Sequence, residues 1–119
     1  MNLMRWYSFY CSLIVISLFF PNNYHWIRES QNPYGKIVYT IDRNFIRKGE
    51  TIWGKIEYNI DGKYIREGQT SYGKILYNID GKYIREGQNP YGKILFNIDG
   101  NYIREGQTSY GKILFNLSK

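Results

Sequence analysis

A repeat of 19 residues is the feature that most constrains how this chain can fold. Five glycines recur at that spacing, each preceded by Tyr or Trp and followed by Lys: Gly35, Gly54, Gly73, Gly92 and Gly111. An Ile-Arg pair recurs in the same phase, from residues 27–28 to residues 103–104. The repeats run without a gap from about His25, and some 95 residues suit one small domain. The chain therefore divides into residues 1–24 and a five-repeat domain over residues 25–119.

Each unit has the pattern of a β-hairpin. Ile94, Phe96 and Ile98 alternate with other residues, which is the period of two expected of a strand with one apolar face. The Asp99-Gly100 pair that follows predicts a two-residue type I′ turn, because Gly accepts a positive φ and Asp tolerates one. This places Phe96 opposite Ile103 and gives the hairpin one apolar and one amphipathic face.

The second unit tests this register. Glu57 stands where later units have Leu, and the same register would place it opposite Arg66. A carboxylate facing a guanidinium across two strands would stabilise the pairing. We therefore expect this pair to form.

The connection between units predicts a second turn. Asn89-Pro90-Tyr91-Gly92 suits a type I turn, and the Thr-Ser-Tyr-Gly of other units can form the same turn. Turn geometry does not require the aromatic residue. We expect each such ring to pack against the neighbouring hairpin. The alternative is a set of exposed platforms on which a sugar or a base stacks.

The fold class expected is all-β. Ten short strands in five hairpins must satisfy their sheet edges, and the last unit is nearly a consensus copy rather than an atypical cap. This favours closure of the five hairpins about a pseudo-five-fold axis, with Ile, Phe and Tyr meeting inside. The alternative is a short open solenoid.

The repeats "GKILYNIDGKYIREGQNPYGKILFNIDG" resemble the bacterial β-flower repeat proteins, in which short hairpins with Tyr-Gly and Asp-Gly turns radiate from a central axis. The resemblance covers roughly residues 25–117. It implies a fold and no particular activity. Choline-binding and glucan-binding wall repeats are less similar, because the Trp residues that their sites use are mostly missing.

Residues 1–24 differ from the repeats. Arg5 precedes the apolar run "FYCSLIVISLFF", which has the length of a signal-peptide core and is shorter than a bilayer span. We expect an apolar N-terminal helix that acts as a signal peptide or, through residues 6–20, as a membrane anchor. Cleavage and retention both remain open. The protein would then be exported to the periplasm or cell surface, or held at the membrane.

The residues needed for common chemistry are scarce in the repeats. The one His is His25 and the one Cys is Cys11 in the apolar run, which predicts no zinc site and no Cys-His nucleophile pair. The repeated Asp residues occupy turns, where Asp is common. No phosphate-binding glycine motif precedes a helix. We expect neither an enzyme nor a bound metal or cofactor.

A binding or structural module remains. The first hypothesis is a binding module for a surface glycan or a protein partner, using these candidate ligand-binding residues: Tyr72, Tyr91, Tyr110, Arg66, Arg85 and Arg104. Ring closure would combine weak sites into one multivalent surface. The second hypothesis is a structural spacer or assembly domain, in which the arginines pair with Glu or stack on Tyr. Nucleic-acid binding is disfavoured despite a net charge of +6, because the cations are not segregated and an exported chain rarely meets nucleic acid.

Overall fold

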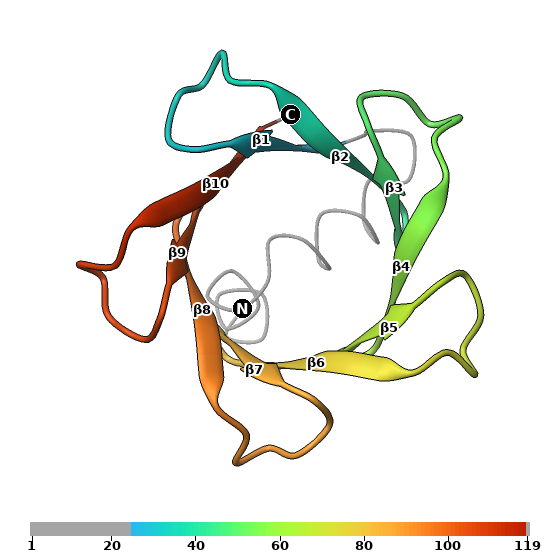
Figure 1. Ribbon diagram of the computed structural model, residues 1–119, viewed down its shortest axis with the longest axis vertical. Coiled ribbons are helices and arrows are strands. Elements are labelled where there is room, and N and C mark those ends of the chain that lie inside the picture. Colours follow the sequence, from blue (N-terminus) through green and yellow to red (C-terminus); the bar gives the residue numbers. More distant parts are fainter. Residues whose placement is uncertain (1–24, 119) are drawn as a thin grey trace, which may run out of the picture.

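The computed structural model describes residues 25–118, which form ten antiparallel strands in a ring (Figure 1). Longer strands of six residues alternate with shorter strands of four or five. The strands are β1 (His25–Glu29), β2 (Ile37–Asp42), β3 (Phe45–Lys48), β4 (Ile56–Asp61), β5 (Tyr64–Glu67), β6 (Ile75–Asp80), β7 (Tyr83–Glu86), β8 (Ile94–Asp99), β9 (Tyr102–Glu105) and β10 (Ile113–Ser118).

The sheet is a closed barrel. Strands that follow one another in sequence are paired, and β1 pairs with β10, from Trp26 opposite Ser118 to Glu29 opposite Phe115. This seam leaves no strand edge unpaired among the described residues, so the prediction of a closed all-β ring is confirmed and the open solenoid is wrong. The five units around the ring are consistent with a pseudo-five-fold axis. The predicted N-terminal helix falls in residues 1–24, outside the described residues.

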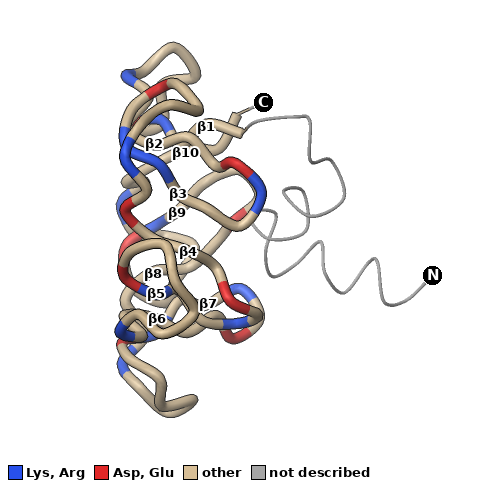
Figure 2. Tube along the Cα trace, turned by 90° about the vertical axis from the view of Figure 1, so that its right-hand side faces the viewer, with Lys and Arg blue, Asp and Glu red and all other residues tan. Residues whose placement is uncertain are grey.

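Two kinds of connection alternate around the barrel. Two-residue tight turns close one end, at residues 43–44, 62–63, 81–82 and 100–101. Longer loops of seven residues connect the strands at the other end and project outward as petals, which Figures 1 and 2 show from two directions. The seam takes the place of a fifth tight turn. Both ends of the described chain, His25 and Ser118, therefore lie at the tight-turn end.

The tight turns differ in detail from the prediction. Asp99 pairs with Tyr102 and Ile98 with Ile103, so the central residues are Gly100 and Asn101 rather than Asp99 and Gly100. Positive φ is confined to the first central residue, at 61° for Gly100, which is the pattern of a type II′ turn rather than type I′. The observed register differs from the predicted one by two residues. Because side chains alternate with a period of two, the apolar face is still predicted correctly.

A β-bulge in each longer strand was also missing from the prediction. Between β5 and β6, for example, Arg66 lies opposite Ile75 and Ile65 opposite Tyr77, which leaves one extra residue on β6. The extra residues are Val38, Glu57, Leu76, Leu95 and Leu114. A bulge bends its strand and increases the local twist, which helps a sheet to curve.

The expected pairing of Glu57 with Arg66 is wrong because the β4–β5 hairpin register differs from the predicted one by two residues. Glu57 is the extra residue of β4, and Arg66 lies opposite Asn59 instead. The Arg66 guanidinium forms its ion pair with Asp61. A register centred on the Asp-Gly pair could not place these charges.

Isoleucines form the core on the inner face of the barrel. Each shorter strand contributes one, each longer strand except β10 contributes one near its end, where β10 has Leu117, and Ile60 pairs directly with Ile65. The buried set is Ile27, Ile41, Ile46, Ile60, Ile65, Ile79, Ile84, Ile98 and Ile103. Tyr and Phe side chains pack against this cluster from the longer strands, so the predicted Ile, Phe and Tyr interior is confirmed.

Candidate functional site

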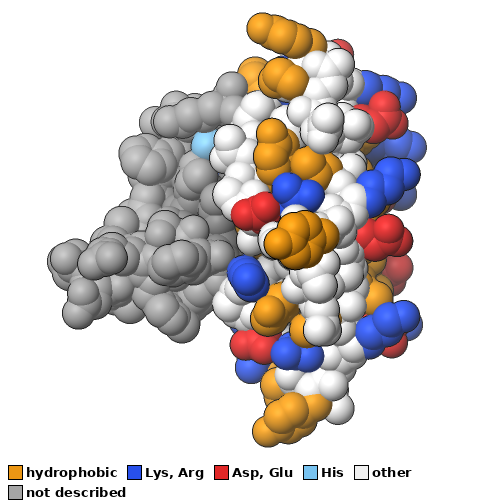
Figure 3. Space-filling view, turned by 90° about the vertical axis from the view of Figure 1, so that its left-hand side faces the viewer, with side chains coloured by type: hydrophobic (Ala, Val, Ile, Leu, Met, Phe, Trp, Pro, Cys, Tyr) orange, Lys and Arg blue, Asp and Glu red, His pale blue; other side chains and the backbone are white. Residues whose placement is uncertain are grey.

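An aromatic side chain stands exposed at the tip of every long loop. The exposed fractions are 90% for Tyr34, 86% for Trp53, 94% for Tyr72, 89% for Tyr91 and 94% for Tyr110. In Figure 3, apolar side chains project from the outer margin of the ring. The expectation that these rings pack against the next hairpin is therefore wrong. Their positions are instead those of the alternative, exposed platforms.

The loop holds each aromatic residue outward through its backbone. The Gly92 amide donates to the Asn89 carbonyl at 2.8 Å, which closes the predicted β-turn, and the Tyr91 amide donates to Asn89 Oδ1 at 2.8 Å. In other loops Thr Oγ1 accepts the same bond, as Thr70 does from the Tyr72 amide at 3.3 Å. Asn and Thr are thus interchangeable because both offer an oxygen to the turn.

The glycine after each aromatic residue is required by a close backbone approach. A Cβ atom on Gly111 would collide with the carbonyl oxygen of Glu105, and the other four loops show the same approach. These glycines do not have a positive φ. The repeated aromatic-Gly pair therefore combines an exposed side chain with a residue that lets the loop base fold against the strand.

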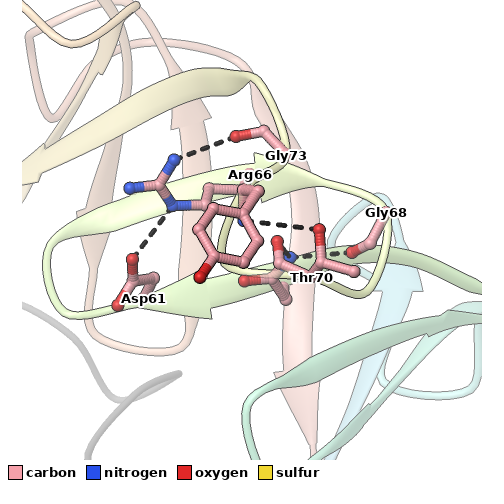
Figure 4. A network of polar contacts seen from close by, with 7 residues as sticks. Asp61, Arg66, Gly68, Thr70 and Gly73 are labelled. Atoms are coloured by element: carbon pink, nitrogen blue, oxygen red, sulfur yellow. Dashed lines mark hydrogen bonds and ion pairs between the residues drawn. The ribbon is translucent and has the colours of Figure 1, made fainter.

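The predicted arginines are bound within the fold (Figure 4). Arg66 Nε lies 2.9 Å from Asp61 Oδ2 at the tight turn, and its Nη1 donates to the Gly73 carbonyl at 2.9 Å at the base of the long loop. The guanidinium carbon also lies 5.8 Å from the Tyr64 ring centroid. Arg85 and Arg104 make the corresponding contacts with Asp80 and Asp99.

The seam reproduces this network with other residues. Arg28 Nε donates to Ser118 Oγ at 3.0 Å, and its Nη1 donates to the Gly35 carbonyl at 2.8 Å. Ser118 on β10 thus occupies the position that Asp has in the continuous hairpins. The arginines were expected to pair with Glu or stack on Tyr; the partner carboxylates are Asp, and stacking on Tyr is confirmed for the three predicted residues.

A row of buried asparagines was missed by the sequence analysis. Asn97 is 2% exposed, and its Nδ2 donates to the carbonyls of Gly106 and Thr108 at 2.9 and 3.0 Å. Asn59, Asn78 and Asn116 make the same two bonds to their loops. Asn recurring in the middle of a strand at the 19-residue period was the available signal. These residues fasten the long loops to the outer wall.

A cavity of about 220 Å³ lies on the barrel axis. Every strand contributes one side chain, an Ile from each shorter strand and an aromatic residue from each longer strand. The five aromatic residues that line the cavity are Tyr39, Tyr58, Tyr77, Phe96 and Phe115. Three hydroxyl-bearing rings thus occupy one arc, and two rings without hydroxyls complete the circle.

The tyrosine arc has its own electrostatics. Tyr39 and Tyr58 pack edge to face, with ring centroids 6.1 Å apart. Burial, followed by the nearby Tyr39, raises the pKa of the Tyr58 hydroxyl. Tyr58 therefore remains a neutral hydrogen-bond donor at physiological pH.

Two further observations concern residues 25–118. No three His, Cys, Asp or Glu side chains among them gather in a way that could hold a metal ion. None of these residues belongs to a helix with the length and apolar character of a membrane span.

A family model described as "6-fold beta flower protein" matches residues 27–119. The match begins in β1 and covers all five units described above. The ring formed by this chain has five units, whereas the family description counts six. No curated protein and no solved structure matches the chain.

Proposed function

The chain belongs to the 6-fold beta flower family, and from this premise we propose that it is a non-enzymatic binding module that uses its loop-tip aromatics. The exposure of all five rings, from 86% to 94%, carries the proposal. An exposed aromatic ring at a fixed position loses little conformational entropy on binding and offers a flat apolar face.

The radial arrangement of the tips favours an extended ligand. The five petals project in different directions from the barrel (Figure 1), so a compact ligand could reach only one or two tips. A repetitive polymer such as a surface glycan could engage several, and the weak individual contacts would then combine. The tyrosines Tyr72, Tyr91 and Tyr110 keep their proposed role, whereas Arg66, Arg85 and Arg104 contribute indirectly by fixing the loops.

The membrane attachment proposed for residues 1–24 would fit this arrangement. β1 begins at the tight-turn end, so a signal or an anchor over residues 6–20 would join the domain there. The petals and the opposite end of the barrel would remain accessible. Export to the periplasm or cell surface would bring the domain to the compartment in which a surface glycan is found.

A glycan array probed with the full chain tests the proposal. We expect retention on one class of repetitive glycan, a partial loss for Tyr91→Ala, and complete loss when all five tip aromatics are replaced by Ala. Partial loss from one substitution is the mark of a multivalent surface. Equal retention of the wild type and the five-site variant would refute the role of the tips.

A structural spacer is the second candidate. The arginines favour it, because the side chains predicted for binding are occupied by Asp carboxylates, loop carbonyls and aromatic rings of the same chain. A spacer would bind no glycan and no partner protein, while its unfolding would depend on the arginines as described in the Discussion. Absence of retention on the array, together with no partner captured by the five tips, would favour this function.

A further inference from the structure

The axial cavity has a charged mouth at the long-loop end. Across each strand pair, an inward aromatic residue lies directly opposite an exposed charged residue, such as Tyr58 opposite Glu67. A backbone hydrogen bond then places an exposed Lys opposite that charged residue, as Lys74 is to Glu67. The resulting ring of charges is called the collar, and consists of Glu29, Lys36, Lys48, Lys55, Glu67, Lys74, Glu86, Lys93, Glu105 and Lys112.

The collar alternates in sign except along one arc. In strand order from β5 round to β1, acidic and basic residues follow one another. Both kinds are visible along this end of the ring, which is at the left-hand edge of Figure 2 and at the right-hand edge of Figure 3. From the start of β2 to the start of β4 the order is broken, because Lys48 stands where the other units have Glu. Lys36, Lys48 and Lys55 are therefore three consecutive cations. None of them forms an ion pair with a described residue.

The basic arc lies above one end of the hydroxyl-bearing side of the cavity, at Tyr39 and beside Tyr58. Tyr39 is on β2, directly opposite Lys48. Tyr58 is on β4, three residues after Lys55 and directly opposite Glu67. In the alternating part of the collar, Glu residues lie opposite the other four rings, Tyr58, Tyr77, Phe96 and Phe115. Positive charge thus coincides with a hydroxyl donor at Tyr39, with the Tyr58 ring adjacent, on one side of an otherwise apolar cup.

We propose that this cup binds a small organic anion, with a single-ring apolar body among the isoleucines and a carboxylate held by Lys48, Tyr39 and Tyr58. The volume fits this body, since about 220 Å³ exceeds the roughly 150 Å³ that accommodates benzene and is below the range of drug-sized pockets. Hydroxyl and ammonium donors pair well with a carboxylate. The cup is separate from the loop tips, and the inference does not depend on the proposed glycan binding.

Phenylacetate is a suitable probe, titrated into the full chain and followed by the backbone amide signals of Tyr39 and Tyr58 in NMR spectra. Phenylacetamide keeps the apolar body without the charge, and acetate keeps the charge without the body. We expect phenylacetate to bind at least roughly tenfold more tightly than either, because a charge-assisted contact and the apolar body both contribute. Equal binding of phenylacetamide, or no response to phenylacetate, would overturn the proposal.

Matched variants locate the anion. Lys48→Glu restores the residue of the other four units, so it should preserve the fold while weakening phenylacetate binding by roughly tenfold or more. Glu105→Lys is the control, since it adds a cation above Phe96, where no hydroxyl is available, and should change the affinity by less than about threefold. Unchanged affinity in Lys48→Glu would refute the basic arc as the anion site.

The hydroxyls are tested in the same way. Tyr39→Phe and Tyr58→Phe should each weaken phenylacetate binding by roughly threefold to tenfold, with little effect on phenylacetamide. Phe96→Tyr adds a hydroxyl on the opposite side and should have little effect on either. Equal losses of phenylacetate affinity in Phe96→Tyr and Tyr58→Phe would contradict the assigned orientation of the carboxylate. A variant with all five tip aromatics replaced by Ala should still bind phenylacetate, which would separate this cup from the loop-tip surface.

Discussion

The wall of each unit and the tip of its long loop repeat with equal regularity, yet their side chains have opposite roles. On the wall, Asn97 and Arg104 are bonded to the loop that covers them. At the tip, the Tyr110 ring is 94% exposed and only its backbone is held. Periodicity alone therefore does not distinguish a residue that builds the fold from one that the fold displays. Substitutions ordered from wall to tip separate the two roles.

The largest effect is expected at the buried asparagine. Asn97→Ala leaves the carbonyls of Gly106 and Thr108 without their donor and should lower the free energy of unfolding by about 2–3 kcal/mol, measured by denaturant unfolding. Asn97→Thr is the matched control, because Thr40 fills this position in the first unit and keeps one bond to its loop, to the Gly49 carbonyl at 2.7 Å. We expect Thr to recover about half of the loss. An alanine variant as stable as the wild type would show that the loops do not depend on the wall.

A smaller effect is expected at the arginine. Arg85→Ala removes the bond to the Gly92 carbonyl and the contact with the Tyr83 ring, and should cost about 1–2 kcal/mol in the free energy of unfolding. Asp80→Ser should cost at most about 0.5 kcal/mol, because the Asp80 side chain is 54% exposed and Ser118 serves in its place at the seam. If the Asp80 variant were the less stable of the two, the ion pair rather than the loop contact would be what matters.

The sequence was informative about the fold for a physical reason. Alternation places Phe96 and Ile98 on the same face whichever of two registers the hairpin adopts, so the inward face was predicted correctly although the register was not. The bulge at Leu95 could not be foreseen from the hairpin, because it lies in the pairing of β8 with β7, the strand on the other side of the long loop. The predicted Glu57–Arg66 pair was wrong because the tight turn shifts the hairpin register by two residues.

The candidate site was harder to predict than the fold. Tyr91 and Arg85 both looked like binding residues, since both are repeated and neither is required by its turn or strand. The loop folds back over the outer wall, and only this three-dimensional contact brings the Gly92 carbonyl to the guanidinium. The same contact leaves the Tyr91 ring outside. The cavity likewise required the barrel to be closed before its ten lining residues could be assigned.

Halfway along the loop, the turn side chain should have a modest effect. Asn89→Ala removes the acceptor for the Tyr91 amide and should lower the free energy of unfolding by about 0.5–1 kcal/mol, because the bond is exposed to water. Asn89→Thr should be indistinguishable from the wild type by the same measurement, since Thr holds this turn in three other loops. A threonine variant as destabilised as alanine would mean that the side-chain acceptor is not what fixes the turn.

The smallest effect is expected at the tip itself. With 89% of its surface exposed, the Tyr91 side chain has few contacts to lose, so Tyr91→Ala should change the free energy of unfolding by no more than about 0.5 kcal/mol. Tyr77→Ala is the matched control, because that ring lines the axial cavity and packs against Phe96 with centroids 6.3 Å apart, and its loss should cost about 2–4 kcal/mol. Thermal melts of the two variants measure the difference directly. A melting point lowered equally by both would show that the tip ring is packed in solution, and the contrast between wall and tip would then be lost along with the proposed binding surface.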